Sequence, residues 1–521
     1  MVPKKIMALT SEYPSLFLLL LLSILFLFLL RRKTATSNRR LPPGPPGWPI
    51  FGNMFQLGDM PHRTLAKLRA KHGPVVWLQI GAINTMTILS ANAATVFFKN
   101  HDHAFADRTI TETMRVHNYD KSSLALAPYG PYWRLMRRLV TVDMLVAKRL
   151  NETAPVRRKC VNDMITWLSK EAEKLEEGGG VHVARFVFLM SFNLLGNLML
   201  SRDLFDPESE DGSEFFAAMI GMMEWTGQAN VADMFPWLRW LDPQGLKRKV
   251  DREMGKALEI ASKFVKQRLA EQHSDKMTRD FLGVWIEFQN SNNEEVLNIS
   301  DKDLNIFILE LFLAGSETTS STIEWAMTQL LRNPECLEKL KSELDQVVGR
   351  EREVEESDID NLPYLQAVIK ETLRLHPPIP MLVPRKAIKD TEFMGYDIPK
   401  DTQVLVNAWA IGRDPDVWEQ PFDFKPQRFV EDCKNIDYKG HHFELIPFGG
   451  GRRMCAGVPL AHRILHLVLG SLLHRFDWKL QNHVTPSTVD MRDRLGVTMR
   501  KLQPLLAVPK LIPPSPSIVN D

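Results

Sequence analysis

Apolar residues recur along most of the chain with the period of a helix. The run at positions 161, 164, 165 and 168 places four apolar side chains on one helical face. Shorter runs rich in β-branched residues occupy residues 75–89 and 391–406 and predict strands. The pattern therefore predicts a mainly helical protein with small β-sheets, an α+β fold.

One predicted helix changes character along its length. It begins after Ser300, a good N-cap residue, and ends before Pro334. Residues 306–314 are apolar nearly all round except for Glu310, so we expect a central, buried helix. Residues 315–322 then read Gly-Ser-Glu-Thr-Thr-Ser-Ser-Thr, which costs helical stability and offers hydroxyls that compete for backbone carbonyls. This segment indicates either a helix opened for a ligand or an ordinary solvent-facing turn.

The N-terminal segment predicts a membrane anchor. Residues 15–30 carry no charge, and as a helix they span about 24 Å, near the core thickness of a thin bilayer. A cleaved signal peptide has a similar length, but basic residues 31–33 stand where a small-residue cleavage site belongs. More basic residues follow the span than precede it, so the positive-inside rule places the rest of the chain in the cytosol. The sequons at Asn151 and Asn298 then stay unmodified, because glycosylation needs the lumen.

The expected domain organisation follows from this reading. Residues 1–14 form a lumenal segment, 15–30 a single transmembrane anchor in the endoplasmic reticulum, and 31–49 a basic and proline-rich hinge. Residues 50–510 form one catalytic domain without a comparable linker, and residues 511–521 form a tail.

Composition and charge narrow the function. Hydrophobic residues make up 44% and charged residues 25%, as in a folded globular protein. The net charge is only +2, and the basic excess lies in residues 1–40, so no basic field for nucleic acid is expected. The four scattered cysteines exclude a disulfide framework and show no zinc-site spacing, which leaves a chemical role for one of them.

Cys455 has the most specific surroundings. Three glycines and two arginines precede it, and helical spacing resumes just after it. A helix N-terminus and the neighbouring Arg452 and Arg453 favour a thiolate, which could be a nucleophile or a metal ligand. A nucleophile needs a nearby base, and His462 points elsewhere along the helix. A ligand of haem iron needs one thiolate and shielding from solvent, which Phe448 can provide.

The same segment resembles the cysteine loop of cytochromes P450, F-x-x-G-x-R-x-C-x-G. The matching residues are Phe448, Gly451, Arg453, Cys455 and Gly457. Further family motifs stand in the family's order: W-x-x-x-R at 133–137, A-G-x-E-T-T at 314–319, E-x-x-R at 371–374 and P-E-R-F at 426–429. Gln427 replaces the acid of the last motif, and Ala456 stands where plant members often have proline; neither change removes a ligand. The resemblance extends from the anchor to about residue 510 and implies the cytochrome P450 fold.

The resemblance also implies a haem b site. Cys455 is then the axial ligand of the iron, Phe448 shields it, and Gly451 and Gly457 let backbone N–H groups approach the sulfur. Contacts to the haem propionates are implied for Trp133, Arg137, Arg385 and Arg453.

Oxygen activation is implied for the polar helix segment. There Thr318 hydrogen-bonds bound oxygen, Glu317 helps to deliver protons, and the small Ala314 and Gly315 leave room for oxygen. A structural, non-catalytic triad is implied for Glu371, Arg374 and Arg428.

The substrate and the electron donor are implied in the same way. The pocket segments would be 108–126, 231–241, 307–318, 379–383 and 496–499, whose apolar residues suit a lipophilic small molecule. The chain most resembles the plant microsomal group that includes geraniol hydroxylases, iridoid oxidases and related terpenoid oxidases, which implies hydroxylation of a monoterpenoid or iridoid, with oxidation on to an aldehyde or acid left open. No flavin or nicotinamide domain is expected, so electrons would come from NADPH through NADPH–cytochrome P450 reductase in the same bilayer. The residues expected to form a basic docking face, or merely a solvated set of charges, are Arg137, Arg138, Lys148, Arg149, Lys439 and Arg452.

Three other functions remain open at this point. A phenolic or flavonoid hydroxylase would share the mechanism and differ in the pocket. A thiolate-haem isomerase would not need the oxygen-activating residues Ala314, Glu317 and Thr318, which are all present. A non-catalytic haem-binding membrane protein would show no NADPH-dependent turnover.

Overall fold

The computed structural model describes residues 39–176, 179–206, 213–271, 280–290 and 299–513, together with Leu19 and Ser23. The expected anchor falls outside the described residues apart from these two, and so do the lumenal segment, the first part of the hinge and residues 514–521. What the sequence predicts for them stays a prediction.

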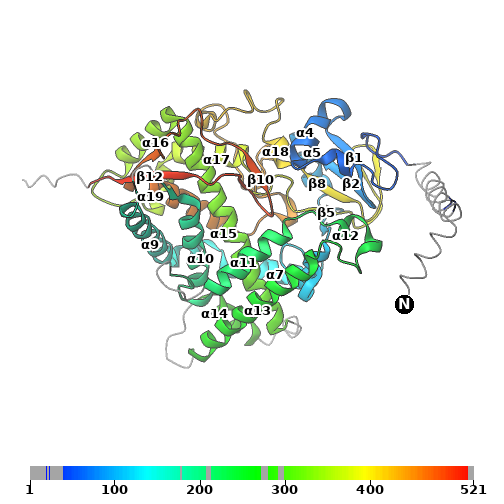
Figure 1. Cartoon of the computed structure of the whole chain (residues 1–521), viewed down its shortest axis with the longest axis horizontal. Coiled ribbons are helices and arrows are strands. Elements are labelled where there is room, and N and C mark those ends of the chain that lie inside the picture. Colours follow the sequence, from blue (N-terminus) through cyan, green and yellow to red (C-terminus); the bar gives the residue numbers. More distant parts are fainter. Residues whose placement is uncertain are drawn as a thin grey trace, which may run out of the picture.

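Helices make up most of the described chain, and the main sheet lies at one end of the molecule (Figure 1). The longer helices are α4 (Pro61–His72), α9 (Ala154–Glu173), α10 (Val183–Leu200), α11 (Ser213–Thr226), α13 (Leu246–Glu271), α14 (Phe281–Asn290), α15 (Asp301–Arg332), α16 (Pro334–Val347), α17 (Pro363–Leu375) and α19 (Val458–Arg475). The shorter ones are α3 (Met54–Leu57), α5 (Ala91–Val96), α6 (Tyr119–Ser122), α7 (Pro131–Arg138), α8 (Ala147–Glu152), α12 (Val231–Met234) and α18 (Ala408–Ile411). The mainly helical α+β prediction is confirmed.

The main sheet has the strand order β1-β2-β8-β5-β3. Its strands are β1 (Val75–Ile80), β2 (Ile83–Ile88), β8 (Gln403–Val406), β5 (Arg385–Lys386) and β3 (Asp107–Arg108). Strands β1 and β2 form a hairpin around Gly81, whose φ is +60° and where a Cβ would lie 2.4 Å from the carbonyl oxygen of Met234. Only glycine fits such a position.

The smaller sheets complete the strand inventory. In one of them β12 (Leu506–Leu511) is the central strand and pairs with β4 (Val181–His182) on one side and β9 (Phe476–Leu480) on the other. The other two pair β10 (Asp493–Leu495) with β11 (Met499–Lys501), and β6 (Thr391–Phe393) with β7 (Tyr396–Ile398). Both β-rich runs that the sequence showed are therefore confirmed as strand regions, since 75–89 contains β1 and β2 and 391–406 contains β6, β7 and β8.

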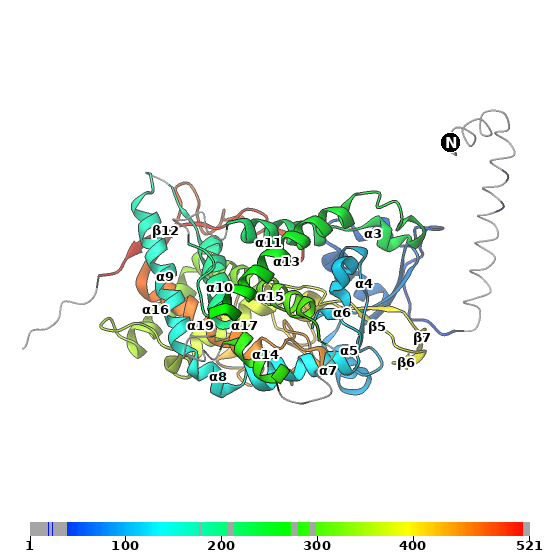
Figure 2. The same ribbon diagram turned by 90° about the horizontal axis from the view of Figure 1, so that it is seen from below.

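Helix α15 has the bounds that the sequence predicts, and it lies in the middle of the helical region (Figure 2). The Ser300 side chain accepts the Asp303 N–H, and the Asp303 carboxylate accepts the Ser300 N–H (2.9 Å). This capping box satisfies two donors that the first turn would otherwise leave free. The helix ends at Arg332, two residues before Pro334.

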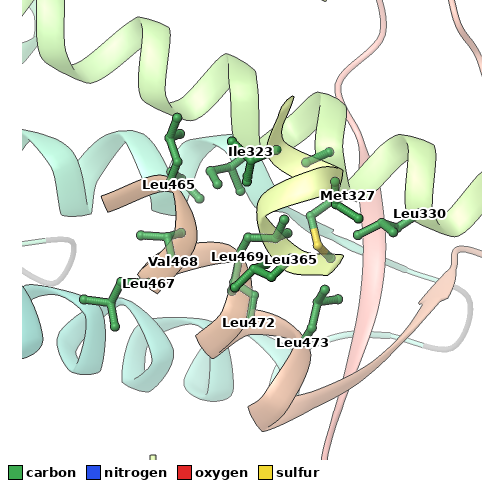
Figure 3. Packing of buried hydrophobic residues seen from close by; sticks show 14 of the residues in the cluster. Ile323, Met327, Leu330, Leu365, Leu465, Leu467, Val468, Leu469, Leu472 and Leu473 are labelled. Carbon is green, nitrogen blue, oxygen red and sulfur yellow. The ribbon is translucent and has the colours of Figure 1, made fainter. Parts of the chain in front are cut away.

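Two apolar clusters meet along α15. Its first half packs with α10, α11, α13 and α14, where the ring of Phe312 lies 4.8 Å from that of Phe192 and 5.5 Å from that of Phe215. Its second half packs against α17 and α19, and Figure 3 shows Ile323 and Met327 of α15 beside the leucines of those two helices. The polar segment 316–322 lies between the two clusters. Its polar side chains are therefore placed near the centre of the molecule, although apolar packing alone would not need them there.

Helix α10 is a core helix. Within the described residues it is the one helix long and apolar enough to cross a membrane, yet 78% of its apolar window is buried inside the protein. Its apolar length is thus explained by its packing against α15 and α9.

Candidate active site

The predicted cysteine loop leads directly into α19. The Cys455 N–H donates to the carbonyl of Phe448 (3.0 Å), which closes the loop. Gly451 has φ +63°, and a Cβ there would lie 2.1 Å from Oδ1 of Asp102, so this position needs glycine. The Arg452 N–H donates to the same carboxylate (2.9 Å), so Asp102, from a distant part of the chain, fixes the position of the loop.

Backbone donors approach the cysteine sulfur as the sequence predicts. The N–H groups of Gly457 and Val458 hydrogen-bond to the sulfur of Cys455. Burial raises the pKa of the Cys455 thiol, whereas these two N–H groups and the guanidinium of Arg137 lower it. The first turn of α19 therefore favours the thiolate, as a helix N-terminus should.

The cation beside the thiol differs from the expected ones. Arg137, on α7, donates to the carbonyl of Met454 (2.6 Å) and interacts with the sulfur. Arg452 instead pairs with Asp102 (3.0 Å), and Arg453 donates to backbone carbonyls. The expectation that arginines next to Cys455 in sequence would act on it is corrected, because the loop turns both side chains toward other partners.

Cys455 and Ala314 both have exposed side chains although their neighbours in sequence pack into the protein. Cys455 is exposed although its surroundings are dense enough for burial to raise its pKa. Ala314 is likewise exposed in the middle of the mostly buried α15. Ala456 and Leu313, the sequence neighbours of Cys455 and Ala314, both pack against the apolar cluster that contains the first half of α15. Cys455 and Ala314 thus present free surface within the interior of the protein.

Trp133 and Arg453 contact each other at the edge of the loop. The guanidinium of Arg453 lies 4.4 Å from the ring centroid of Trp133, whose Nε1 donates to the carbonyl of Leu124 (2.9 Å). Arg453 also donates to the carbonyls of Ala106 (2.8 Å) and Ala127 (2.6 Å). Trp133 and Arg453, two of the predicted cofactor residues, are therefore both held by carbonyl groups of the segment that contains Leu124 and Ala127.

Arg385 completes this group from strand β5. Its guanidinium donates to Asp102 (2.6 Å) and to the carbonyl of Gly450 (2.6 Å), and it lies 5.1 Å from the ring centroid of Phe98. Burial opposes ionisation of Asp102, yet Arg385 and Arg452 hold the pKa of its carboxyl below the usual range.

Three buried arginines, Arg108, Arg385 and Arg453, lie within electrostatic reach of one another. Burial lowers the pKa of Arg108, Arg385 and Arg453, that of Arg453 to about 10, and Arg385 repels the other two. Sequence reasoning missed both Asp102 and Arg108, because neither belongs to a recognisable motif and their partners lie far along the chain. An anionic ligand would relieve the repulsion among these buried guanidinium groups.

Glu317 and Thr318 lie on the polar segment of α15 with different partners. Glu317 Oε1 accepts from Nε of Arg500 (2.9 Å), while its Oε2 is buried without a partner. Burial raises the pKa of Glu317, and Arg500 opposes that shift. Thr318 Oγ1 donates to the carbonyl of Ala314 (2.6 Å), so the hydroxyl lies over the exposed alanine. Arg500, on β11, is a further residue that no sequence signal marked.

Gly315 has a packing role instead of the expected one. A Cβ there would lie 2.9 Å from Cδ1 of Leu195 on α10, so the glycine allows two helices to approach. Space beside the helix is therefore provided by Ala314 and not by Gly315. Helix α15 continues unbroken through this segment, and Ser316, Glu317 and Thr319 to Thr322 are buried, so neither an opened helix nor a solvent-facing turn describes it.

The predicted structural triad comes together. Glu371 forms two hydrogen bonds with Arg374 (both 2.7 Å) and one with Arg428 (3.2 Å). The Glu371 and Arg374 side chains are fully buried. Arg374 also donates to the carbonyls of Gly412 (2.6 Å) and Pro421 (2.7 Å), so one ion pair joins α17 to two loops. The substituted Gln427 lies outside this group and contacts Lys339 and Glu431.

Comparison with known proteins identifies the class. The cytochrome P450 family model matches residues 42–507. The chain is 51% identical to an iridoid oxidase of Catharanthus roseus over 94% of this chain and 95% of that protein, and 41% identical to a geraniol 8-hydroxylase of the same plant over 95% and 100%. A solved zebra fish cytochrome P450 with progesterone has a TM-score of 0.73 and 26% identity, covering 86% of this chain and 99% of that one.

The chain belongs to the cytochrome P450 family. It is therefore a haem-thiolate monooxygenase that uses O2 and a lipophilic substrate, which confirms the family and cofactor expectations. The site fits that cofactor: one cysteine sulfur that accepts backbone N–H donors could bind the iron, and the cluster of buried arginines could bind the two propionate carboxylates of a haem.

Proposed function

We propose that this protein hydroxylates a monoterpenoid or an iridoid. The observation that carries the proposal is the 51% identity to an iridoid oxidase along nearly the whole of both chains. The expected pocket segments support it, because Leu313, Met381 and Leu382 are apolar and only partly buried. Fold alone does not fix a substrate, so the proposal depends on this similarity.

The proposed residue roles are those that the family resemblance implies, and the geometry of the site supports them. Cys455 would hold the iron, with Phe448, Gly451 and Gly457 fixing the loop around the sulfur. The residues that would hold the propionates are Trp133, Arg137, Arg385 and Arg453. When bound, the haem supplies a thiolate-ligated iron that activates O2 for insertion of one oxygen atom into a C–H bond.

Proton delivery falls to α15. The Thr318 hydroxyl can turn from the Ala314 carbonyl toward bound O2, because Thr318 is partly exposed and Ala314 is exposed. The unpartnered Oε2 of Glu317 can bind and release a proton while Oε1 stays on Arg500. Arg500 is one-third exposed, so the ion pair holds the buried Glu317 near the boundary between the interior and solvent. Such an arrangement supplies protons without admitting bulk water.

Electrons and location complete the proposal. NADPH–cytochrome P450 reductase would supply the electrons, and residues 15–30 would anchor the catalytic domain, 50–510, on the cytosolic side of the endoplasmic reticulum. Arg138, Lys148 and Lys439 are exposed and could contact an acidic donor. Of the other residues expected on that face, Arg149 and Arg452 pair with Glu152 and Asp102.

The test is turnover in microsomes that contain the reductase. Monoterpenols, iridoids and simple phenolics are supplied with NADPH, and products are analysed by mass spectrometry. A terpenoid product one oxygen atom heavier, absent without NADPH, is expected. Oxidation of the phenolics alone would contradict the substrate proposal, and the absence of any product from haem-loaded protein would contradict the enzymatic one.

A further inference from the structure

Glu310 is a carboxylate in the apolar first half of α15, and none of the roles above uses it. Its side chain is buried, and burial raises the pKa of the carboxyl. Three donors from consecutive residues reach it: Ser123 Oγ (2.5 Å) and the Ala125 N–H (2.8 Å) donate to Oε1, and the Leu124 N–H (2.6 Å) donates to Oε2. One carboxylate thus holds a short loop against the central helix.

The carbonyl groups of the same loop accept from cationic and aromatic donors. The Leu124 carbonyl accepts from Nε1 of Trp133 (2.9 Å) and from Nη1 of Arg453 (3.5 Å). The Ala125 carbonyl accepts from Nε of Arg108 (2.9 Å). The peptide group between Leu124 and Ala125 therefore points its N–H end at Glu310 and its C=O end at the Trp133 indole and the Arg453 guanidinium. Hydrogen bonds arranged in such a chain polarise and strengthen one another.

We propose that Glu310 is a positioning residue for the haem. By orienting the peptide groups of residues 123–125, it places the Leu124 carbonyl so that Trp133 and Arg453 are held ready for the propionates. The inference rests on the proposed propionate roles of those two residues. It predicts that loss of the Glu310 carboxylate weakens haem retention although Glu310 itself need not touch the cofactor.

A matched control exists on the same helix. Glu324 is also buried, and its carboxylate also accepts a backbone N–H, that of Leu505 (2.8 Å). Leu505 belongs to the C-terminal part of the chain and not to the loop at 123–125. Glu324→Gln therefore replaces a buried carboxyl group on α15 without disturbing the loop.

The experiment measures the rate at which the purified ferric holoenzyme releases haem to excess apomyoglobin, at a temperature where circular dichroism shows every variant to be folded. Glu310→Gln presents an amide NH2 group to the loop N–H donors, so at least about a tenfold faster release is expected, which corresponds to about 1.4 kcal/mol. Glu310→Asp keeps the charge at a shorter reach and should release haem at an intermediate rate. Glu324→Gln should release it at the wild-type rate. A wild-type rate for Glu310→Gln would overturn the inference, and so would equal acceleration in Glu324→Gln.

Two further variants separate this inference from the assignment beneath it. Trp133→Phe and Arg453→Lys should both accelerate haem release. If they do and Glu310→Gln does not, the positioning role is wrong while the propionate assignment stands; if neither does, both are wrong. Should Glu310→Gln not fold, Ser123→Ala removes one donor and should still accelerate release about threefold, and a wild-type rate there would overturn the inference.

Discussion

Thr318 and Glu317 are neighbours in sequence whose side chains face different surroundings. The threonine hydroxyl lies over the exposed Ala314, while the glutamate is buried against Arg500. In the proposed roles the Thr318 hydroxyl bonds to activated oxygen and the Glu317 carboxyl supplies protons, and the two groups act from different faces of the helix.

Thr318→Ala should therefore uncouple the enzyme. Product formed per NADPH consumed is expected to fall about tenfold or more, with hydrogen peroxide accounting for the difference, because general acid–base groups contribute about 10²–10⁴-fold. The ratio is measured by mass spectrometry and NADPH absorbance in the same reaction. Thr319→Ala, which loses a hydroxyl bonded to the Gly315 carbonyl (2.7 Å), is the matched control. An unchanged ratio in Thr318→Ala would contradict the role.

Glu324 should make stability depend on pH. Burial raises the pKa of its carboxyl to about 7. The Leu505 N–H, Lys501 and Arg500 lower this pKa, but their effect is smaller than that of burial. Because the folded protein prefers the protonated form, stability from this group is full below the unfolded pKa near 4.5 and is lost as pH rises through 7. Between pH 5 and pH 8, the free energy of unfolding of the wild type should fall by about 2–3 kcal/mol relative to Glu324→Gln. Parallel pH profiles of the two melting temperatures would contradict this prediction.

Some site residues were predictable from sequence and others were not, for a physical reason. The Cys455 loop is local: its glycines, its cysteine and the following helix are consecutive, so their geometry can be read from their order. Asp102, Arg108 and Arg500 act on groups that lie hundreds of residues away or on another element. Only the folded chain brings such charges together, and a single sequence does not show which of its many arginines become buried.

At the scale of whole elements, α15 shows both what a local pattern gives and what it omits. Its ends were predictable because capping residues and a following proline act within one turn of the backbone. The prediction that Gly315 leaves room for oxygen was wrong, because Leu195 of α10 occupies the space beside this glycine. Helix-to-helix contacts of this kind leave no mark in the local sequence.

Helix α17 is fixed to its neighbouring loops by a buried ion pair. Removing one partner leaves the other charge buried without compensation, which costs about 3–5 kcal/mol. Glu371→Ala should lower the free energy of unfolding by that amount, measured by chemical denaturation. Glu259→Ala breaks the Lys263 pair on α13 (3.0 Å), whose side chains are 64% and 70% exposed, and should cost less than about 1 kcal/mol. Equal effects of the two changes would contradict the structural role of the triad.

At the scale of the whole molecule, the fold brings two apolar clusters together around one helix and leaves the polar part of that helix between them. Hydrophobic patterning made the mainly helical class and the strand regions predictable. The arrangement of the helices was given by the family resemblance and not by the pattern, because helix packing depends on shape complementarity between distant faces.

The proposed topology makes a prediction for intact microsomes. Added protease should digest the catalytic domain without detergent, because the proposed topology places residues 50–510 in the cytosol. Asn151 is exposed, yet it should carry no glycan, so endoglycosidase should leave the electrophoretic mobility unchanged. Protection from protease, or a glycan on Asn151, would place the domain in the lumen and contradict the anchor orientation.

Isotope labelling is the decisive test of whether this protein is a monooxygenase of terpenoid substrates. Microsomes with the reductase, NADPH and a monoterpenol or iridoid are supplied with ¹⁸O₂ in ordinary water, and the product is examined by mass spectrometry. We expect a hydroxylated product that carries one oxygen-18 atom, and we expect Cys455→Ala to lose this product. A product whose new oxygen comes from water, or one that forms equally well without Cys455, would contradict it.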